Sequence, residues 1–436
     1  MPPYAEQSAF SRLCGAGCST CYPRSLRQSY FVAQLTVIQK LMSSLSWIDF
    51  DENDRQRVRG ILALFEEKET RDELGLGPIR DSIADHLFPG TSTLQTRLRY
   101  MFFIPWIYMM VQKDDTRSHE LVELARGREI RLIDSLRCGG EEEGVIGRAA
   151  GASLKRLPSS IYWTGLKSWG IRIFPGSQEA YFASLPSLRR HRHRSRSADH
   201  SSAIDGFDKK LWSPGLPRPP RDLLEQADFR LTHDEAGFLI DRLVNSQPNS
   251  LLAHLARSPR RVECEFVWAH PDFSAFPPAA KRLVEHAKVF SAVLHGASLL
   301  YNLMLAECGD NEDWVERYRA ELSRWKTDEF DQTAVSDWSL PEFWDCIKHE
   351  NHRVQYRSRS FVEKWRELAH EKCGEVADLE SARELVRERE KALKRSQSRF
   401  VNHAVLARWG GRSGADRLNF RWREANSHVR DLADAD

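Results

Sequence analysis

Residues 45–108 read LSWIDFDENDRQRVRGILALFEEKETRDELGLGPIRDSIADHLFPGTSTLQTRLRYMFFIPWIY, and this stretch decides the fold class. Apolar residues recur at intervals of three or four on both sides of Pro89-Gly90-Thr91, which is the spacing of amphipathic helices. Pro78 suits the first turn of one helix, and Pro89-Gly90 would end it. The pattern predicts a helix-turn-helix-like element in the N-terminal part of a mainly α-helical protein.

The helix expected over residues 91–100 has two different faces. Steps of 100° per residue gather its apolar side chains on one face, suited to a core: Leu94, Leu98, Met101 and Phe102. Gln and Arg make bidentate contacts to base edges, Ser and Thr bond phosphates, and helix-turn-helix proteins dock their second helix in this way. The candidate DNA-binding residues on the opposite face are Ser92, Gln95, Thr96 and Arg99. The alternative is an ordinary solvated face.

The composition is that of a globular protein with room for two or three domains. Of its 436 residues 29% are charged and 10% aromatic, and the formal net charge is only +2. A histone-like polycation is therefore excluded, and any DNA must be bound by a local patch. The apolar run 101–111 contains Pro105 and is shorter than the roughly 20 residues of a membrane span. We expect no membrane partner.

Cysteine usage indicates the compartment. Cys138, Cys264, Cys308, Cys346 and Cys373 are scattered singly, which suits a reducing cytoplasm better than a disulfide framework. The N-terminus lacks a basic region followed by an apolar stretch, so no secretory signal is expected. A cytoplasmic location follows as a prediction.

Changes in sequence character predict two helical lobes. Strong patterning begins after Met42, so residues 1–41 are expected to be a non-conserved or spurious extension. Residues 42–188 form the predicted N-terminal helical domain. Residues 189–221, with RRHRHRSRSADHSS and LWSPGLPRPPRD, form a basic and Pro-rich linker. Residues 222–436 form the second helical domain, where Gly296 in an apolar helix predicts a close approach of another element.

Two further basic stretches are candidate contact surfaces. Lys155 and Arg156 precede Tyr162, Trp163 and Trp169, and bases interleaved with aromatics can clamp a phosphate backbone and stack bases. The alternative is that these aromatics form a core rimmed by solvated bases. Residues 376–409 keep near-heptad apolar spacing with a charged face, which is either solvated or binds a partner helix or nucleic acid along Arg387, Lys394, Arg395 and Arg399.

Catalytic constellations of high specificity are missing, so the catalytic residues are unknown. Cys14, Cys18 and Cys21 have the spacing of radical S-adenosylmethionine enzymes, but Thr20 replaces an aromatic and no alternation of strands and helices follows. His349 and His352 lie three apart, as a metal-binding pair on a helix could, without the zinc-protease pattern. We expect no cofactor and no metal.

Several runs of the sequence resemble a known protein family. The runs LSWIDFDENDR, TRDELGLGPIRD and FPGTSTLQTRLRYMFFIPWIY, with RLPSSIYWTGLKSWGI and RWGGRSGADRLNFRW downstream, resemble a family of bacterial proteins known only as a domain of unknown function. The resemblance covers about residues 42–430. It implies a setting near helicases and mobile or defence genes, and it supplies no catalytic residues.

Three functions of different classes remain after these observations. The first is a DNA-associated component of an antiviral defence or mobile-element system, with duplex DNA as partner. The second is an enzyme acting on DNA, either a nuclease or a base-excising glycosylase. The third is a helical scaffold that binds a helicase-like or other defence protein.

Overall fold

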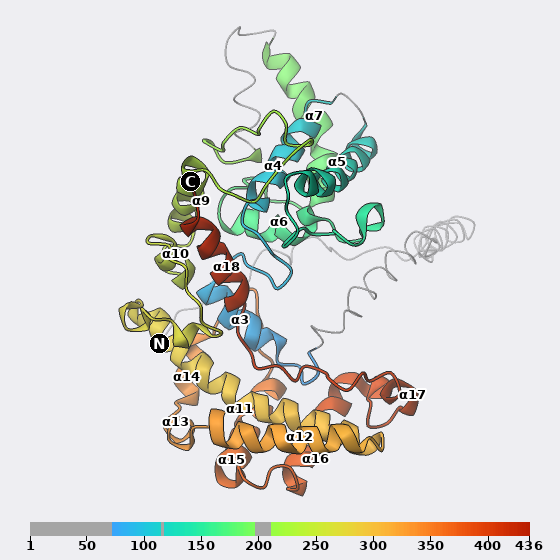
Figure 1. The fold of residues 1–436 in the computed structure, drawn as a ribbon, viewed down its shortest axis with the longest axis vertical. Coiled ribbons are helices and arrows are strands. Elements are labelled where there is room, and N and C mark those ends of the chain that lie inside the picture. The colour runs from blue at the N-terminus through green and yellow to red at the C-terminus, as the bar shows by residue number, and fades with distance from the viewer. Residues whose placement is uncertain (1–71, 115–116, 197–210) are drawn as a thin grey trace, which may run out of the picture. The chain divides into compact units, whose positions relative to one another are not determined.

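A computed structural model describes residues 72–114, 117–196 and 211–436 (Figure 1). All of them belong to one compact unit, Lys68–Asp436. Within these ranges the chain forms fifteen α-helices and no β-strand, with two isolated bridges, Arg172 to Trp212 and His349 to His352. The mainly α-helical prediction is confirmed. Residues 45–71 of the quoted stretch and the cysteines at 14, 18 and 21 lie outside the described residues.

The first half of the described chain contains α3 (Gly77–Leu87), α4 (Tyr100–Val111), α5 (Ser118–Cys138), α6 (Pro158–Ser168) and α7 (Gln178–Arg196). The second half begins with α9 (His233–Ser246), α10 (Leu251–Ala256), α11 (Pro278–Cys308), α12 (Glu312–Arg324), α13 (Gln332–Ser336) and α14 (Leu340–Cys346). It ends with α15 (Tyr356–Lys372), α16 (Glu380–Lys394), α17 (His403–Leu406) and α18 (Trp422–Ala433).

Helix α11 is the central element of the second half. Its 31 residues are mostly apolar, and it packs against α12, α15, α16 and α3 (Figure 1). By length and composition α11 could cross a membrane, but 83% of its most apolar window is buried inside the protein. Such burial is that of a core helix, whose apolar surface is removed from water by its neighbours.

Two tryptophans fix the neighbours of α11. The Trp325 indole donates to the Ala292 carbonyl at 2.7 Å, and the Trp365 indole donates to the Val293 carbonyl at 2.7 Å. A methyl group added at Gly296 would lie 2.4 Å from the Trp325 ring, closer than atoms can pack. The close approach predicted at Gly296 is therefore confirmed.

Aromatic side chains fill the core between α4, α5 and α6. Tyr100 packs on Tyr162 with ring centroids 5.3 Å apart, and Tyr108 packs on Trp163 at 5.7 Å. Of the predicted core residues, Leu98, Met101 and Phe102 are fully buried, whereas Leu94 is half-buried. The apolar character of residues 101–111 thus reflects an interior helix, as the sequence indicated.

Contacts join the two halves of the sequence. Helix α11 contacts α3, and α10 contacts both α3 and α18. Arg97 pairs with Asp431 at 3.0 Å, which links residues 334 positions apart. Helix α7 continues to Arg196 inside the predicted linker, and Trp212 is buried. The boundary near residue 200 stays a prediction.

The second helix of the predicted helix-turn-helix begins at Tyr100, not at Thr91. Residues 91–99, here called the 91–99 segment, form turns instead. The Tyr162 hydroxyl accepts the amides of Thr96 at 2.9 Å and Arg97 at 3.2 Å, and Asp431 accepts the amide of Leu98 at 2.7 Å. These distant acceptors replace the bonds of a helix, so a helix over residues 91–99 was a wrong prediction.

The helical pattern predicted over residues 376–409 is also interrupted. Helix α16 ends at Lys394, and Arg395 has a φ of 51°, which turns the chain. Two cations of the predicted binding face point inward, since Lys394 and Arg399 both pair with the buried Glu73. Arg387 pairs with Glu384 at 2.7 Å on its own helix.

Candidate functional site

Most of the side chains of the 91–99 segment that were predicted to contact DNA form hydrogen bonds or ion pairs within the protein instead. Gln95 is 4% exposed and donates to the Gly90 carbonyl at 3.0 Å. Arg99 is 8% exposed and pairs with Asp228 at 2.5 Å and Glu235 at 3.2 Å. Thr96 donates its hydroxyl to Gly144 at 2.6 Å, and Ser92 is half-buried. Their contact with DNA stays a prediction.

The second predicted surface lies around α6. Lys155 is exposed and Arg156 is half-buried, so a cation is available to a ligand there. Tyr162 and Trp169 are fully buried and Trp163 is 9% exposed. These rings are core side chains, and the structure does not bring them to a surface where bases could stack.

A different polar site forms where α3 meets the loop between α14 and α15. His349 and His352 stand at the two ends of a tight turn, with the His352 amide donating to the His349 carbonyl at 3.2 Å. The pair therefore lies on a turn and not on a helix. We call this the 349–352 turn.

Side chains of α3 position the start of this turn. The Ser82 hydroxyl donates to the Ile347 carbonyl at 2.5 Å, and His86 Nε2 lies 3.0 Å from the Lys348 carbonyl. Ser82 and His86 are four apart, so they project from one face of the helix. Ile347 is buried and anchors the chain beside them. The turn is thus held by a helix more than 260 residues away in sequence.

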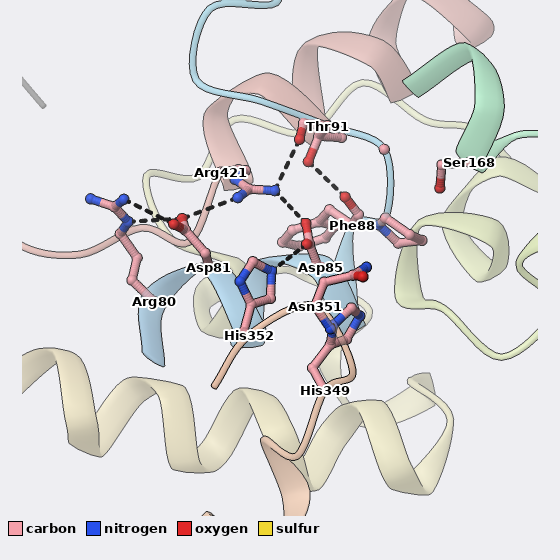
Figure 2. A network of polar contacts seen from close by, with 12 residues as sticks. Arg80, Asp81, Asp85, Phe88, Thr91, Ser168, His349, Asn351, His352 and Arg421 are labelled. Atoms are coloured by element: carbon pink, nitrogen blue, oxygen red, sulfur yellow. Dashed lines mark hydrogen bonds and ion pairs between the residues drawn. The ribbon is translucent and has the colours of Figure 1, made fainter. Parts of the chain in front are cut away.

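Asp85 is the centre of the polar network. One carboxylate oxygen lies 2.6 Å from His352 Nε2, and the other accepts from Arg421 Nη1 at 2.5 Å (Figure 2). Arg421 also donates to the Thr91 carbonyl at 2.9 Å and to Asp81 at 3.0 Å. Its φ of 65° places it at the turn that begins α18. One guanidinium therefore ties α3, the 91–99 segment and α18 together.

Charge and burial shape the ionisation of this network. Burial raises the pKa of Asp81, but the guanidiniums of Arg80 and Arg421 outweigh burial and leave the pKa below its usual value. Burial and the neighbouring His86 lower the pKa of His349. The neutral form of His349 is thereby favoured, which leaves a ring nitrogen able to accept or to coordinate.

Asp85, His349 and His352 come together as possible metal ligands. One nitrogen or oxygen atom from each lies within 4.8 Å of the others, and all three side chains are half-buried. The His86 and His349 rings meet edge to face at 4.9 Å between centroids. Hollows of about 570 Å³ and about 550 Å³ reach His349, the first also lined by Asp85 and the second by His352.

Exposed cations lie on both sides of the 349–352 turn in the sequence. Lys348, Arg353 and Arg357 are exposed, and Tyr356 between them is 81% exposed. Lys348 pairs with Asp345 at 2.5 Å, whereas neither Arg353 nor Arg357 forms an ion pair with a carboxylate among the described residues. We call Lys348, Arg353, Tyr356 and Arg357 the basic edge.

Sequence reasoning missed most of this site for definite reasons. Asp85 and Arg421 are joined to the turn only by folding, and no local pattern connects them. The run HRVQYRSRS, by contrast, sets an aromatic among bases and is visible in the sequence. This pattern of an aromatic residue among arginines is the sequence feature that indicates the basic edge.

Comparisons with known proteins identify a family. A family model described as a family of unknown function, DUF6361, matches residues 42–436. No curated protein and no solved structure matches the chain. The match begins at Met42, where the patterned sequence begins, and extends a few residues beyond the range that the resemblance indicated. The chain therefore belongs to DUF6361, a family of unknown function.

Proposed function

We propose that this protein associates with DNA through the basic edge. The observation that carries the proposal is the exposure of Tyr356, at 81%, between two arginines that pair with no described carboxylate. An exposed aromatic ring can stack on a nucleic-acid base, and unpaired guanidiniums are the usual partners of phosphates. Both features occur within five residues of each other.

The local charge of residues 348–359 supports this surface. Residues 348–359 carry four cations, Lys348, Arg353, Arg357 and Arg359, against a single acid, Glu350. Because the whole chain is nearly neutral, a ligand of high negative charge is attracted to such a patch and not to the protein at large. Arg359 lies 5.2 Å from the Trp344 ring, which holds its guanidinium near the edge.

Salt-dependent binding tests the proposal. Fluorescence anisotropy with a labelled duplex would give dissociation constants across a range of salt concentrations for the full-length protein. Replacing both Arg353 and Arg357 with Ala should weaken binding and lower the slope of log K against log salt by about 2, one for each phosphate contact. A matched double variant, Arg218→Ala with Arg221→Ala, removes two exposed arginines elsewhere and should bind like the wild type. Wild-type protein that shows no salt-dependent binding would overturn the proposal.

The 91–99 segment and Lys155 offer a second contact surface under the same proposal. Lys155→Ala tests this surface with little risk to folding, because the side chain is exposed. Gln95→Ala and Arg99→Ala need a melting curve beside the binding assay, since both side chains are buried and bonded. A loss of affinity in Lys155→Ala that exceeds the loss in the basic-edge variant would move the contact to α6.

We further propose that DNA association serves an antiviral defence or mobile-element system in the bacterial cytoplasm. The support is the setting implied by the family resemblance.

Three experiments separate this proposal from its alternatives. Phage plaque counts in cells with and without the gene test the defence role. Co-purification of a helicase-like partner tests the scaffold alternative. DNA incubated with the protein, with and without Mg²⁺, would show nicks or abasic sites if the protein were an enzyme acting on DNA.

A further inference from the structure

We infer that Asp85, His349 and His352 form a binding site for a divalent transition metal of the zinc class. The inference goes beyond the proposed function and stands on the geometry around α3 and the 349–352 turn. Three ligands of the right chemical type come from two segments that the fold alone brings together. A carboxylate and two imidazoles are a common zinc ligand set, and imidazole selects Zn²⁺ and its neighbours over Mg²⁺.

The three ligand atoms lie near enough to one another to bind a single ion. They lie within 4.8 Å of one another, and the Asp85 and His352 atoms are already 2.6 Å apart. Bonds of about 2.0–2.2 Å in a tetrahedral site would separate ligand atoms by a little over 3 Å. The Asp85–His352 pair must open slightly and His349 must move in by up to about 1.5 Å, changes that side-chain rotations within a turn can supply.

Neighbouring side chains already orient two of the three ligands, Asp85 and His349. Arg421 holds the Asp85 oxygen that faces away from His352, so the other oxygen stays directed at the turn (Figure 2). The His86 ring packs edge to face on His349 and is itself held by the Lys348 carbonyl. Outer partners of this kind fix ring orientation in zinc sites and raise metal affinity.

Binding has a defined structural cost. The metal replaces the hydrogen bond between Asp85 and His352, and coordination through His349 Nε2 would release the 3.2 Å bond from the Asn351 amide to His349 Nδ1. The first bond is part-buried and the second is exposed, so their loss costs little compared with the free energy released when zinc binds at a structural site. The residues that line the two hollows leave one side of the ligand set open, which suits a fourth ligand from water or a bound anion.

Zinc stoichiometry in the full-length chain tests the inference. Cys14, Cys18 and Cys21 lie outside the described residues and are themselves strong zinc ligands, so the test uses a background in which all three are Ser. Protein equilibrated with Zn²⁺, freed of excess ion and analysed by mass spectrometry of the metal should hold about one equivalent. Asp85→Asn, His349→Ala and His352→Ala should each lose it, whereas the exposed His119→Ala should retain it.

A spectroscopic measurement protects the test against variants that fail to fold. Co²⁺ in place of Zn²⁺ should give the intense visible absorption of a four-coordinate site, and Asp85→Asn, which preserves side-chain shape, should abolish it while circular dichroism stays helical. Absence of a bound equivalent in the Cys-to-Ser background would overturn the inference. Equal zinc content in the wild type and in both His variants would also overturn it. Neither result depends on DNA binding.

Discussion

The 91–99 segment and the 349–352 turn are both irregular connections rich in polar side chains, yet they use those side chains in opposite ways. Gln95 and Arg99 are buried and bonded to groups of the protein itself. At the turn, the histidines are half-buried beside open hollows, and Arg353 and Tyr356 face solvent. A polar residue in an irregular segment therefore indicates function only once its burial and partners are known.

The largest expected effect comes from the acceptor that holds the 91–99 segment. Asp431 is buried, pairs with Arg97 and accepts the Leu98 amide. Burial raises the pKa of Asp431 and outweighs the opposing effect of the Arg97 guanidinium. Asp431→Ala should lower the free energy of unfolding by about 4 kcal/mol, because a buried amide and a guanidinium lose their partner.

Asp434 provides the matched control for Asp431. It lies one turn further along the chain and pairs with Arg261, which is exposed. Denaturation in urea should show Asp434→Ala close to the wild type, since exposed ion pairs contribute little. A similar loss of stability in the two variants would contradict the view that the segment depends on a buried acceptor.

The next prediction concerns how stability depends on pH, and it involves a histidine on α18, the helix that also carries Asp431. His428 follows Ser427, whose hydroxyl bonds the Thr96 carbonyl, and its ring is fully buried with no hydrogen-bond partner among the described residues. Burial lowers the pKa of His428 to about 4. The unfolded chain takes up this proton near pH 6.5 and the folded chain does not, so the contribution of His428 to stability should fall by about 3 kcal/mol as pH drops from 6.5 to 4.

His428→Leu should remove that fall in stability, as measured by melting at several pH values. His119→Ala, on the exposed face of α5, should keep it. A pH profile that is unchanged in His428→Leu would show that the ring is hydrated or bonded in solution.

Glu129 of α5 should make stability depend on pH in the opposite direction. It accepts the Ser159 amide at the start of α6, the helix that supplies Tyr162. Burial raises the pKa of Glu129 to about 7, outweighing the bonds from Ser159. The folded chain keeps the proton that the unfolded chain loses above about pH 4.5, so the contribution of Glu129 to stability should fall by up to about 3 kcal/mol as pH rises from 4.5 to 7.

Glu129→Gln checks this reading by melting at pH 4 and pH 8. The variant should match the wild type at pH 4, where both forms are neutral, and should be more stable at pH 8. A variant that is less stable at both values would mean that the carboxyl group itself is required.

The smallest expected effect lies at the turn. Asp85 is half-buried, and its bonds to His352 and Arg421 are partly screened by solvent. With EDTA present to exclude bound metal, Asp85→Asn should lower the free energy of unfolding by about 1 kcal/mol in urea. A loss as large as that of Asp431→Ala would make the turn a structural clamp, and would remove the contrast between the two regions.

Local patterning predicted the parts of the fold that local interactions determine. Local patterning located α3 and the apolar helix α11, and Gly296 was correctly assigned to a close approach. The 91–99 segment was misassigned because Tyr162 and Asp431, which accept its amides, are distant in sequence. The site around Asp85 and the 349–352 turn could not be predicted for the same reason. Asp85 and His352 are 267 residues apart, and their pairing exists only in the folded chain.

Hydrogen–deuterium exchange in the presence of duplex DNA tests the central claim most directly, because it compares the two regions in one unmutated protein. Peptides covering residues 348–359 should gain protection when DNA is added at low salt and lose it at high salt, while peptides covering residues 91–99 should be unchanged. Protection confined to residues 91–99, or no protection in either region under conditions where DNA is bound, would contradict the assignment of the basic edge as the contact surface.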